Sequence, residues 1–323
     1  MRANIRRWAC LALLAALPLT AAAVATAYPT SVVTMVVPYP AGTATDAFGR
    51  IFARHLETQL GQKFLVENRP GANGMNGTET VTRAKADGYT LLFTTNSPHT
   101  TVQWLYKKVP YDPIKDFEPV AHLYSGSPLF VARPELGIET LSQLIAYAKA
   151  NPGKINIGTA NASGQLAVEL LKKRAAIDIV NVPYRGTPQA LADLLGGSVQ
   201  LIAADVPIAG PLIESGKLRP VAFFSKDRNP AYPQVATFHE IAGPGIDLST
   251  WSGVMAPKNT PKEVVSAIAE ALRKTLEQTE IKEHATRIGS TLTFIGPKEL
   301  EAKLVDDAKR WSAMISEAEI QPE

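Results

Sequence analysis

The chain has 323 residues, of which 46% are apolar and 20% are charged, and its formal net charge is +3. This composition is typical of a folded globular protein, and the length suits two domains. The one cysteine, Cys10, lies in the N-terminal apolar segment, so the remainder of the chain has no disulfide, cysteine nucleophile or thiolate metal site.

Residues 1–27 are typical of a secretory signal peptide. Three arginines precede an apolar run over 8–19, and small residues follow up to an A-x-A pattern at 25–27. We expect cleavage near Ala27; the alternative is an uncleaved anchor, for which the run is short. Cleavage removes three basic residues and no acidic one, which leaves 30 of each sign. A mature chain without net charge gives no case for nucleic acid binding.

Beyond residue 28, strand-like and helix-like patterns alternate. The strand-like runs are 32–37, 63–67, 89–95, 119–124, 154–159, 177–182, 199–204 and 219–224. The first helix shows the apolar stripe Phe48, Phe52, Leu56 and Leu60. Further helices are predicted near 139–150, 163–175, 187–196, 207–216, 260–288 and 297–318. This alternation predicts an α/β fold with mostly parallel, doubly wound sheets.

Two loose segments inside the chain suggest where it passes between domains. They are 124-YSGSP-128 and 243-GPGIDLSTW-251. If both are crossovers, residues 28–125 and 247–323 form a discontinuous first lobe, and residues 126–246 form a second. Two α/β lobes joined by two strands would leave a ligand cleft between them.

Five strand ends are followed by small, polar or helix-capping residues. They are 41-AGTATD-46, 96-NSPH-99, 160-ANASGQ-165, 183-PYRGTPQ-189 and 205-DVP-207. The carboxyl ends of parallel strands meet at one edge, where open α/β sheets bind ligands. A helix start there offers unpaired N–H groups and a positive dipole end. The pattern therefore predicts an anion site.

The candidate ligand-binding residues lie at or next to these strand ends. They are Tyr39, Ala41, Gly42, Thr43, Ala44, Thr45, Asp46, Asn96, Ser97, His99, Thr159, Asn161, Ser163, Gln165, Tyr184, Arg185 and Asp205. Each has a structural alternative. Asp46 stabilises the dipole of its own helix and would repel an anion; Arg185 suits either a carboxylate or a surface ion pair; a lone histidine such as His99 is commonly structural.

Local motifs of catalysis are absent from the sequence. There is no G-x-S-x-G, no G-x-x-x-x-G-K-[ST] and no H-E-x-x-H, and the glycines of 71-GANGMNG-77 do not have dinucleotide-binding spacing. A secreted hydrolase or lyase would have to use Asp46, Asp205 and His99, which no motif organises. The sequence therefore favours a binding protein over an enzyme.

These residues resemble the Bug-type extracytoplasmic solute receptors of tripartite tricarboxylate transporters. The resemblance covers nearly the whole mature chain, and its segments follow the family order: 37-VPYPAGTATD-46, 66-VENRPGANGMNGTETV-81, 86-ADGYTLL-92, 110-PYDPIKDFEPV-120, 151-NPGKIN-156, 182-VPYRGTPQALADLLGGSVQ-200, 216-GKLRPVA-222 and 251-WSGVMAPKNTP-261.

The resemblance implies a two-lobed fold like the type II periplasmic binding proteins, without catalysis, metal or cofactor. It implies that the 41–46 loop holds a carboxylate through backbone groups and waters, and that 159–165 serves the ligand from the other lobe. Two departures fall in this site: Thr43 replaces a usual glycine, and Gln165 stands where histidine is common. The identity of the ligand therefore does not carry over.

The resulting hypothesis is a monomeric periplasmic receptor. It would capture a small di-, tri- or aromatic carboxylate by lobe closure and deliver it to two integral membrane transporter subunits. A receptor that serves a sensor kinase is the alternative that the sequence leaves open.

Overall fold

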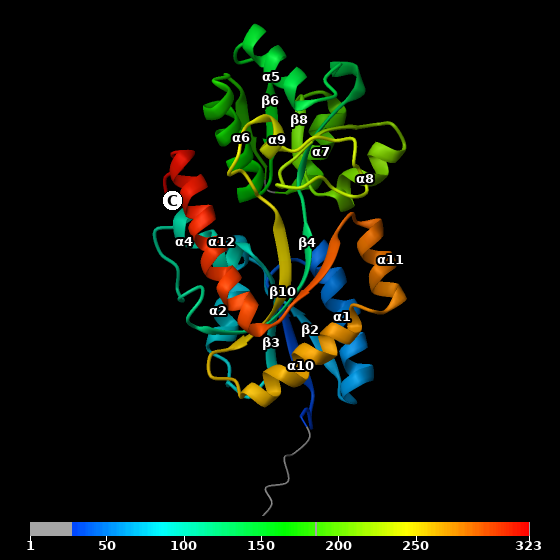
Figure 1. Ribbon diagram of the computed structural model, residues 1–323, viewed down its shortest axis with the longest axis vertical. Coiled ribbons are helices and arrows are strands. Elements are labelled where there is room, and N and C mark those ends of the chain that lie inside the picture. Colours follow the sequence, from blue (N-terminus) through cyan, green and yellow to red (C-terminus); the bar gives the residue numbers. More distant parts are fainter. Residues whose placement is uncertain (1–27, 185, 323) are drawn as a thin grey trace, which may run out of the picture.

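Two β-sheets, each flanked by helices, divide the molecule into two lobes stacked along its long axis (Figure 1). The structure is a computed structural model that describes residues 28–184 and 186–322. The predicted signal peptide and Arg185 lie outside the described residues. The two sheets confirm the predicted α/β fold with two lobes.

The first lobe contains a six-stranded sheet with the order β11-β4-β10-β3-β1-β2. Its strands are β1 (Val33–Val37), β2 (Phe64–Asn68), β3 (Thr90–Thr95), β4 (Phe117–Gly126), β10 (Thr250–Pro257) and β11 (Thr291–Ile295). The helices that accompany it are α1 (Ala44–Leu60), α2 (Met75–Thr82) after the short turn η1 (Ala72–Gly74), α3 (Ser97–Thr100), α4 (Val102–Leu105), α10 (Lys262–Thr275), α11 (Thr279–Arg287) and α12 (Pro297–Glu317).

The second lobe contains a five-stranded sheet with the order β7-β6-β8-β5-β9. Its strands are β5 (Leu129–Ala132), β6 (Asn156–Thr159), β7 (Val180–Pro183), β8 (Leu201–Ala204) and β9 (Arg219–Phe223). The helices are η2 (Pro134–Leu136), α5 (Leu141–Ala150), α6 (Ala162–Ala175), α7 (Thr187–Gly196), α8 (Val206–Glu214) and α9 (Phe238–Ile241).

The prediction of mostly parallel sheets is wrong. Among the described residues, four strand pairings are parallel and five are antiparallel. The antiparallel pairings all involve β4, β5 or β10, which carry the chain between the lobes and run against their neighbours. The strands β5, β10 and β11 were not predicted, and the single helix expected over 260–288 is two helices, α10 and α11.

The predicted stripe of α1 packs into the first lobe. Phe48, Phe52 and Leu56 are fully buried, and Leu60 packs at the edge of the same core. The Phe48 ring stacks on Tyr124 of β4 with ring centroids 4.0 Å apart. The helix thus anchors its N-terminus beside the end of β4, because its apolar face fixes its position on the sheet.

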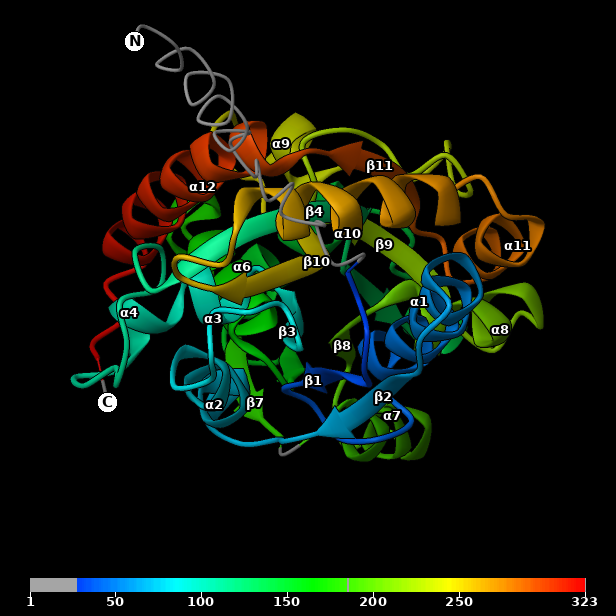
Figure 2. The ribbon, with the colours of Figure 1, turned by 90° about the horizontal axis from the view of Figure 1, so that it is seen from below.

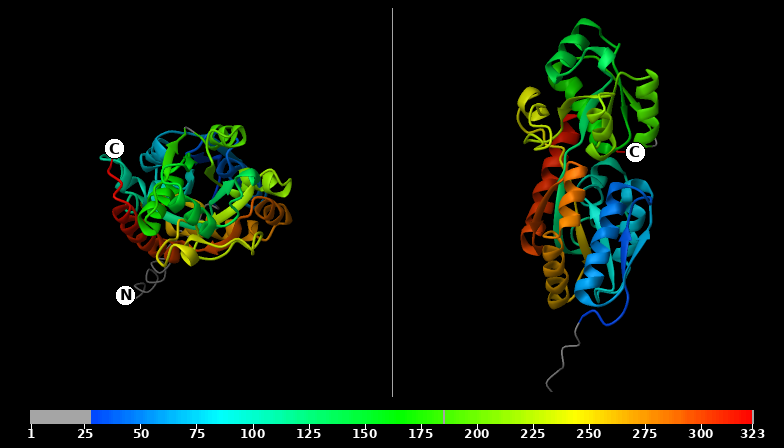
Figure 3. Two further views of the ribbon diagram at one scale, coloured as in Figure 1. Left: turned by 90° about the horizontal axis from the view of Figure 1, so that it is seen from above. Right: turned by 90° about the vertical axis from the view of Figure 1, so that its right-hand side faces the viewer.

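Two strands and one helix connect the lobes (Figures 1 and 3). The chain leaves the first sheet at the end of β4 and returns to it in β10. Helix α12 packs Leu300 and Leu304 against the first lobe, whereas Trp311 and Met314 enter the core of the second. None of the helices among the described residues is long and apolar enough to span a membrane.

Candidate ligand-binding site

The first predicted loop forms the start of α1 and presents backbone donors. Thr43 is the N-cap: its side-chain oxygen accepts from the Asp46 N–H at 3.3 Å, and its hydroxyl donates to the Pro40 carbonyl at 2.9 Å. Within the described part of the chain, nothing accepts from the N–H groups of Ala44 and Thr45. These two donors at the positive end of α1 are available to an anion.

The Asp46 carboxylate, almost fully buried, is used within the loop. It accepts hydrogen bonds from the Gly42 N–H at 2.9 Å, from the Asn68 amide at 2.8 Å and from Arg50 Nε at 3.2 Å. Burial acts to raise the pKa of Asp46, but these hydrogen bonds and the Arg50 charge together lower it. Arg50 therefore offsets the negative charge that would otherwise repel an anion from this helix start. Ala41 and Gly42 are exposed in the turn that Asp46 fixes.

Tyr124, which the sequence analysis did not select, lies beside this loop. Its hydroxyl faces the hydroxyls of Thr45 and Ser252; burial raises its pKa, and these two neighbours partly offset the shift. In the sequence, Tyr124 only ends an apolar run, which is a weak sign of a ligand site. The stacking on Phe48 and the pairing of β4 with β10 bring it to this loop, and neither can be read from the sequence.

Tyr39 lies on the other side of the first strand end. Its hydroxyl is 2.5 Å from the Thr95 hydroxyl, and burial raises the pKa of Tyr39 to about 12. A β-carbon at Gly74 would lie 3.3 Å from the Tyr39 hydroxyl oxygen and 3.0 Å from Cγ of Pro98. Glycine at 74, with φ of 90°, thus lets the 71–77 segment approach the ends of β1 and β3 closely.

The loop after β3 separates into exposed and buried members. Ser97 is partly exposed, and its hydroxyl has no hydrogen bond to a described residue. Asn96 is buried, and its N–H and side-chain oxygen bond the backbone of Trp251 at 3.0 and 3.3 Å. His99 is fully buried against Phe117, with ring centroids 4.9 Å apart, and burial lowers its pKa to about 4. His99 therefore packs in the lobe, as its structural alternative anticipates.

In the second lobe, the start of α6 mirrors the start of α1. The Asn161 side chain caps α6 by accepting from the Gly164 N–H at 2.9 Å. The N–H groups of Ala162 and Ser163 have no partner among the described residues. The Ser163 side chain is buried at this helix start, and Gln165, two residues further on, is exposed. This end of α6 offers a second pair of backbone donors.

Two candidates in the second lobe have their hydroxyls committed. The Thr159 hydroxyl donates to the Asn181 side-chain oxygen at 2.7 Å. The Tyr184 hydroxyl donates to the Asp193 carboxylate at 2.7 Å, and burial followed by the Asp193 interaction raises the pKa of Tyr184 to about 12. The neighbouring candidate Arg185 lies outside the described residues.

Asp205 follows strand β8 directly and is the N-cap of α8. It interacts electrostatically with the Tyr124 hydroxyl, and burial raises its pKa. The structure thus brings the loop at Thr45, the Tyr124 side chain and Asp205 to one place between the lobes. Within the described ranges, no three His, Cys, Asp or Glu side chains gather as a metal site.

A pocket of about 280 Å³ lies elsewhere, at the crossovers, and residues of both lobes line it, among them Ser125, Asn229 and Lys303. None of the candidate residues that the structure describes lines it. Viewed from below, α12 and β11 lie on one side of β4 and β10, whereas β1, β8 and α7 lie on the other (Figure 2). The pocket and the predicted loops are therefore formed by different residues.

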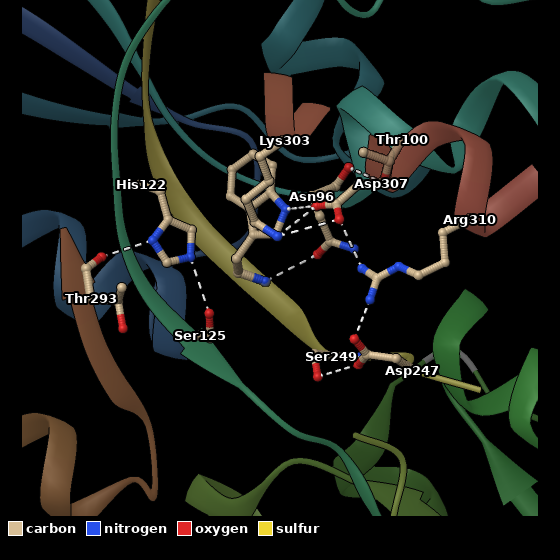
Figure 4. A network of polar contacts seen from close by, with 11 residues as sticks. Asn96, Thr100, His122, Ser125, Asp247, Ser249, Thr293, Lys303, Asp307 and Arg310 are labelled. Carbon is tan, nitrogen blue, oxygen red and sulfur yellow. Dashed lines mark hydrogen bonds and ion pairs between the residues drawn. The ribbon is translucent and has the colours of Figure 1, made fainter. Parts of the chain in front are cut away.

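A polar network joins the crossover to the C-terminal helix (Figure 4). Asp307 of α12 accepts from Trp251 Nε1 at 2.8 Å and from Arg310 at 2.9 Å, and Arg310 also pairs with Asp247. Trp251 in turn bonds the backbone and side chain of Asn96. The network connects the loop after β3 with the segment that leaves the second lobe, and sequence patterns gave no sign of it.

The comparisons with known proteins agree with this architecture. Residues 48–320 match the family described as "Tripartite tricarboxylate transporter family receptor". The chain belongs to this family. It is 33% identical over 293 residues to Protein BugT of Bordetella pertussis, covering 90% of each chain. It is 34% identical to a UPF0065 protein of Pseudomonas sp. strain P51, covering 90% of this chain and 87% of that one.

Several solved structures also resemble this chain over most of its length. A Rhodopseudomonas palustris protein solved with adipate has a TM-score of 0.83 and 31% identity, and the match covers 92% of this chain and all of that one. MatC from Rhodopseudomonas palustris, with bound malate, has a TM-score of 0.77 and 29% identity over 89% of this chain and all of its own. The periplasmic binding protein BugD has a TM-score of 0.80 and 31% identity over 92% of this chain and all of its own. The family consists of substrate-binding receptors, and this member is a solute-binding protein of the Bug type.

Proposed function

We propose that this receptor captures a small carboxylate between its lobes and delivers it to the two integral membrane subunits of a tripartite tricarboxylate-type transporter. One observation carries the proposal: the unpaired N–H groups of Ala44 and Thr45 lie at a helix start whose own acidic residue, Asp46, is neutralised by Arg50. A carboxylate fits such a site because the helix end supplies hydrogen-bond donors and a positive potential.

The proposed contacts come from both lobes. The first lobe supplies the N–H groups of Ala44 and Thr45 and the hydroxyl of Ser97, and the second supplies the α6 start with Ser163 and Gln165. The other candidates have a supporting role in which they shape the loops; they are Tyr39, Ala41, Gly42, Thr43, Asp46, Asn96, His99, Thr159, Asn161 and Tyr184. Asp205 lies near the same region and is considered separately below.

The energetics suit this assignment. Hydrogen bonds to a charged group contribute about 1.5–3 kcal/mol each, and a helix end adds about 0.3–1 kcal/mol. Micromolar affinity corresponds to about 8 kcal/mol. Four backbone donors from α1 and α6 can reach that value after the costs of association, which favours binding in which both lobes take part.

The ligand class follows from the related structures. The proteins solved with adipate and malate contain aliphatic dicarboxylates, and both resemble this chain over nearly its whole length. We therefore propose an aliphatic di- or tricarboxylate as the first class to test, with aromatic carboxylates as the second. Thr43 places a β-carbon and a hydroxyl in the first loop. We therefore propose that the preferred carboxylate of this protein differs from those of the related proteins.

We further propose a cleaved signal peptide at residues 1–27, a periplasmic location and a monomer. The lobes are proposed to be residues 28–125 with 247–323, and residues 126–246. Every strand of the first sheet lies within 33–126 or 250–295, and every strand of the second lies within 129–223, which supports these bounds. The end of α12 packs on the second lobe, so this helix must slide or bend if the lobes close.

A thermal-shift screen of refolded, ligand-free mature protein tests the function. The panel holds aliphatic di- and tricarboxylates, aromatic carboxylates, acidic amino acids and nucleotides. A ligand at 100 times its Kd adds about 2.7 kcal/mol of stability, which raises Tm by several degrees. Shifts confined to carboxylates support the proposal. A shift from a nucleotide and from no carboxylate contradicts it.

A pair of proline variants tests the site itself. Ala44 is the first residue of α1, and the preceding Thr43 is extended, with φ of −73° and ψ of 161°. Proline is tolerated there and removes only the N–H. Ala44→Pro should lower the affinity for the carboxylate found in the screen by about tenfold or more, because one charge-assisted hydrogen bond is lost. Lys262→Pro at the first position of α10 is the matched control and should leave affinity unchanged.

A further inference from the structure

Asp205 occupies a capping position but does not cap its helix. It is the N-cap of α8, yet its side chain accepts no hydrogen bond from the helix. The sequence explains this: Pro207 at the second helical position has no N–H, and the Ile208 N–H donates to the carbonyl of Asp205 itself at 3.0 Å. Among the described residues, which do not include Arg185, no group donates to the carboxylate.

The start of α8 lies against the first lobe. The residue after Asp205, Val206, packs on Gly289 so closely that a β-carbon at 289 would lie 2.5 Å from Cγ1 of Val206. Asp205 interacts electrostatically with Tyr124, whose hydroxyl lies beside Thr45 of the first loop. Asp205 thus lies at the boundary between the lobes, within electrostatic reach of a hydroxyl that faces the first loop, and burial raises its pKa.

Around Asp205 and the first loop, the basic side chain Arg50 is already paired, whereas the acidic side chain Asp205 is not paired with any described residue. Arg50, the basic side chain next to the first loop, is committed to Asp46 and Asn68. The donors of α1 and α6 are neutral N–H groups, which suit one carboxylate each. Asp205 adds an unpaired acceptor in a partly buried setting, where like charges repel more strongly than in water. A ligand group that approaches Asp205 is therefore favoured when it can donate a hydrogen bond.

We propose that Asp205 is a specificity-determining residue that selects carboxylates bearing a hydroxyl or ammonium group on the carbon next to a carboxylate. The inference rests on the proposed function. The donor of the ligand bonds the Asp205 carboxylate, while its carboxylates occupy the starts of α1 and α6. An unsubstituted diacid leaves Asp205 without a partner, and a buried acceptor without a partner weakens binding.

Titration calorimetry at one pH tests this with ligand series that differ only at that carbon. The series are succinate, L-malate and L-aspartate; glutarate, 2-hydroxyglutarate and L-glutamate; and phenylacetate, mandelate and phenylglycine. In at least one series, the hydroxyl or amino member should bind wild-type protein at least tenfold more tightly than the unsubstituted acid. In Asp205→Ala this ratio should fall below about threefold.

Asp306→Asn is the matched control, since it removes one negative charge from an exposed position of α12 and should leave the ratio unchanged. If Asp205→Ala does not fold, 2-methoxysuccinate replaces it: this ligand keeps the bulk of malate without the donor and should bind wild-type protein no better than succinate. A tenfold preference for unsubstituted acids, or a ratio that survives in Asp205→Ala, overturns the inference. If no carboxylate in any series binds, the proposed function fails first.

Discussion

The indole N–H of Trp251 donates to the Asp307 carboxylate over 2.8 Å, and this bond ties the crossover strand β10 to helix α12. Asp307 is 5% exposed and also pairs with Lys303 and Arg310. Asp307→Ala removes the acceptor of the indole N–H and of Lys303, and one of the two carboxylates that pair with Arg310. We expect a loss of about 2 kcal/mol in the free energy of unfolding, below the value for fully buried pairs because both cations are partly exposed.

A double-mutant cycle isolates the bond. Trp251→Phe alone should cost about 1 kcal/mol or more, and its coupling with Asp307→Ala in urea unfolding should be about 1 kcal/mol. The exposed Asp306→Asn should stay within about 0.5 kcal/mol of wild type. Additive effects of the two substitutions would show that the bond does not stabilise the crossover.

Gly77 allows α2 to approach the first strand end. A β-carbon there would lie 2.7 Å from the Arg69 carbonyl oxygen and 2.8 Å from Cα of Pro38, both backbone atoms. Gly77→Ala should therefore destabilise the protein by about 1–3 kcal/mol. Gly196→Ala is the matched control: it lies at the end of α7 with no atom within 4 Å of the added carbon, and it should stabilise by up to about 1 kcal/mol. Equal effects of both variants in urea unfolding would contradict this packing argument.

The Asp46 contacts predict unequal effects of two substitutions. Asp46→Ala leaves the Gly42 N–H and the Asn68 amide without their acceptor and should cost about 2–3 kcal/mol. Asp46→Asn keeps one acceptor oxygen, but it turns the other into an NH2 donor that faces the Gly42 N–H or the Asn68 amide, and it loses the ion pair with half-exposed Arg50; it should therefore cost about 1–2 kcal/mol, less than Asp46→Ala. The exposed Arg69–Glu67 pair provides the control, and Glu67→Ala should change stability by less than about 0.5 kcal/mol. Equal losses from the two Asp46 variants would mean that the charge, and not the loop bonds, matters.

Two buried histidines predict a dependence of stability on pH. Burial lowers the pKa of His99 and of His122 to about 4, whereas an unfolded histidine titrates near 6.5. The unfolded chain therefore binds protons that the folded chain does not. The stability that these neutral imidazoles contribute is complete above about pH 6.5 and is lost as the pH falls towards 4.

Between pH 7 and pH 5, each imidazole should remove about 2 kcal/mol from the free energy of unfolding. Carboxylates with lowered pKa, such as Asp46 and Asp247, lose their contribution at lower pH, so the window from pH 7 to pH 5 isolates the histidines. Urea unfolding across this window should give a flatter profile for His122→Gln and for His99→Gln than for wild type. If the free energy of unfolding changes equally with pH in the variants and in wild type, groups other than these histidines cause the pH dependence.

Local patterns predicted much of the fold because they depend on neighbours in the chain. The stripe of α1 is readable from spacing and residue type alone, and the structure contains it. The strands β5 and β10 escaped prediction, although every residue of β5 is buried, because their sequences are short or contain small residues and proline. Pairing with distant partners makes them strands.

The candidate site divides in the same way. The sequence placed Asp46 and His99 near strand ends, but it could not say where their side chains point. Only the packed structure commits Asp46 to Gly42, Arg50 and Asn68, and turns His99 towards Phe117. Tyr124 was missed because it approaches Thr45 only when α1 has packed on β4 and β4 has paired with β10.

The sequence by itself determined the helix starts, the alternation of strands and helices and the family resemblance, since each depends on residue types at short spacing. The tertiary structure decided which helix starts keep free donors, that Asp205 comes within electrostatic reach of Tyr124, and that α12 bridges the lobes. These relationships join residues far apart in the chain, and long-range packing and burial, rather than local propensity, bring them together.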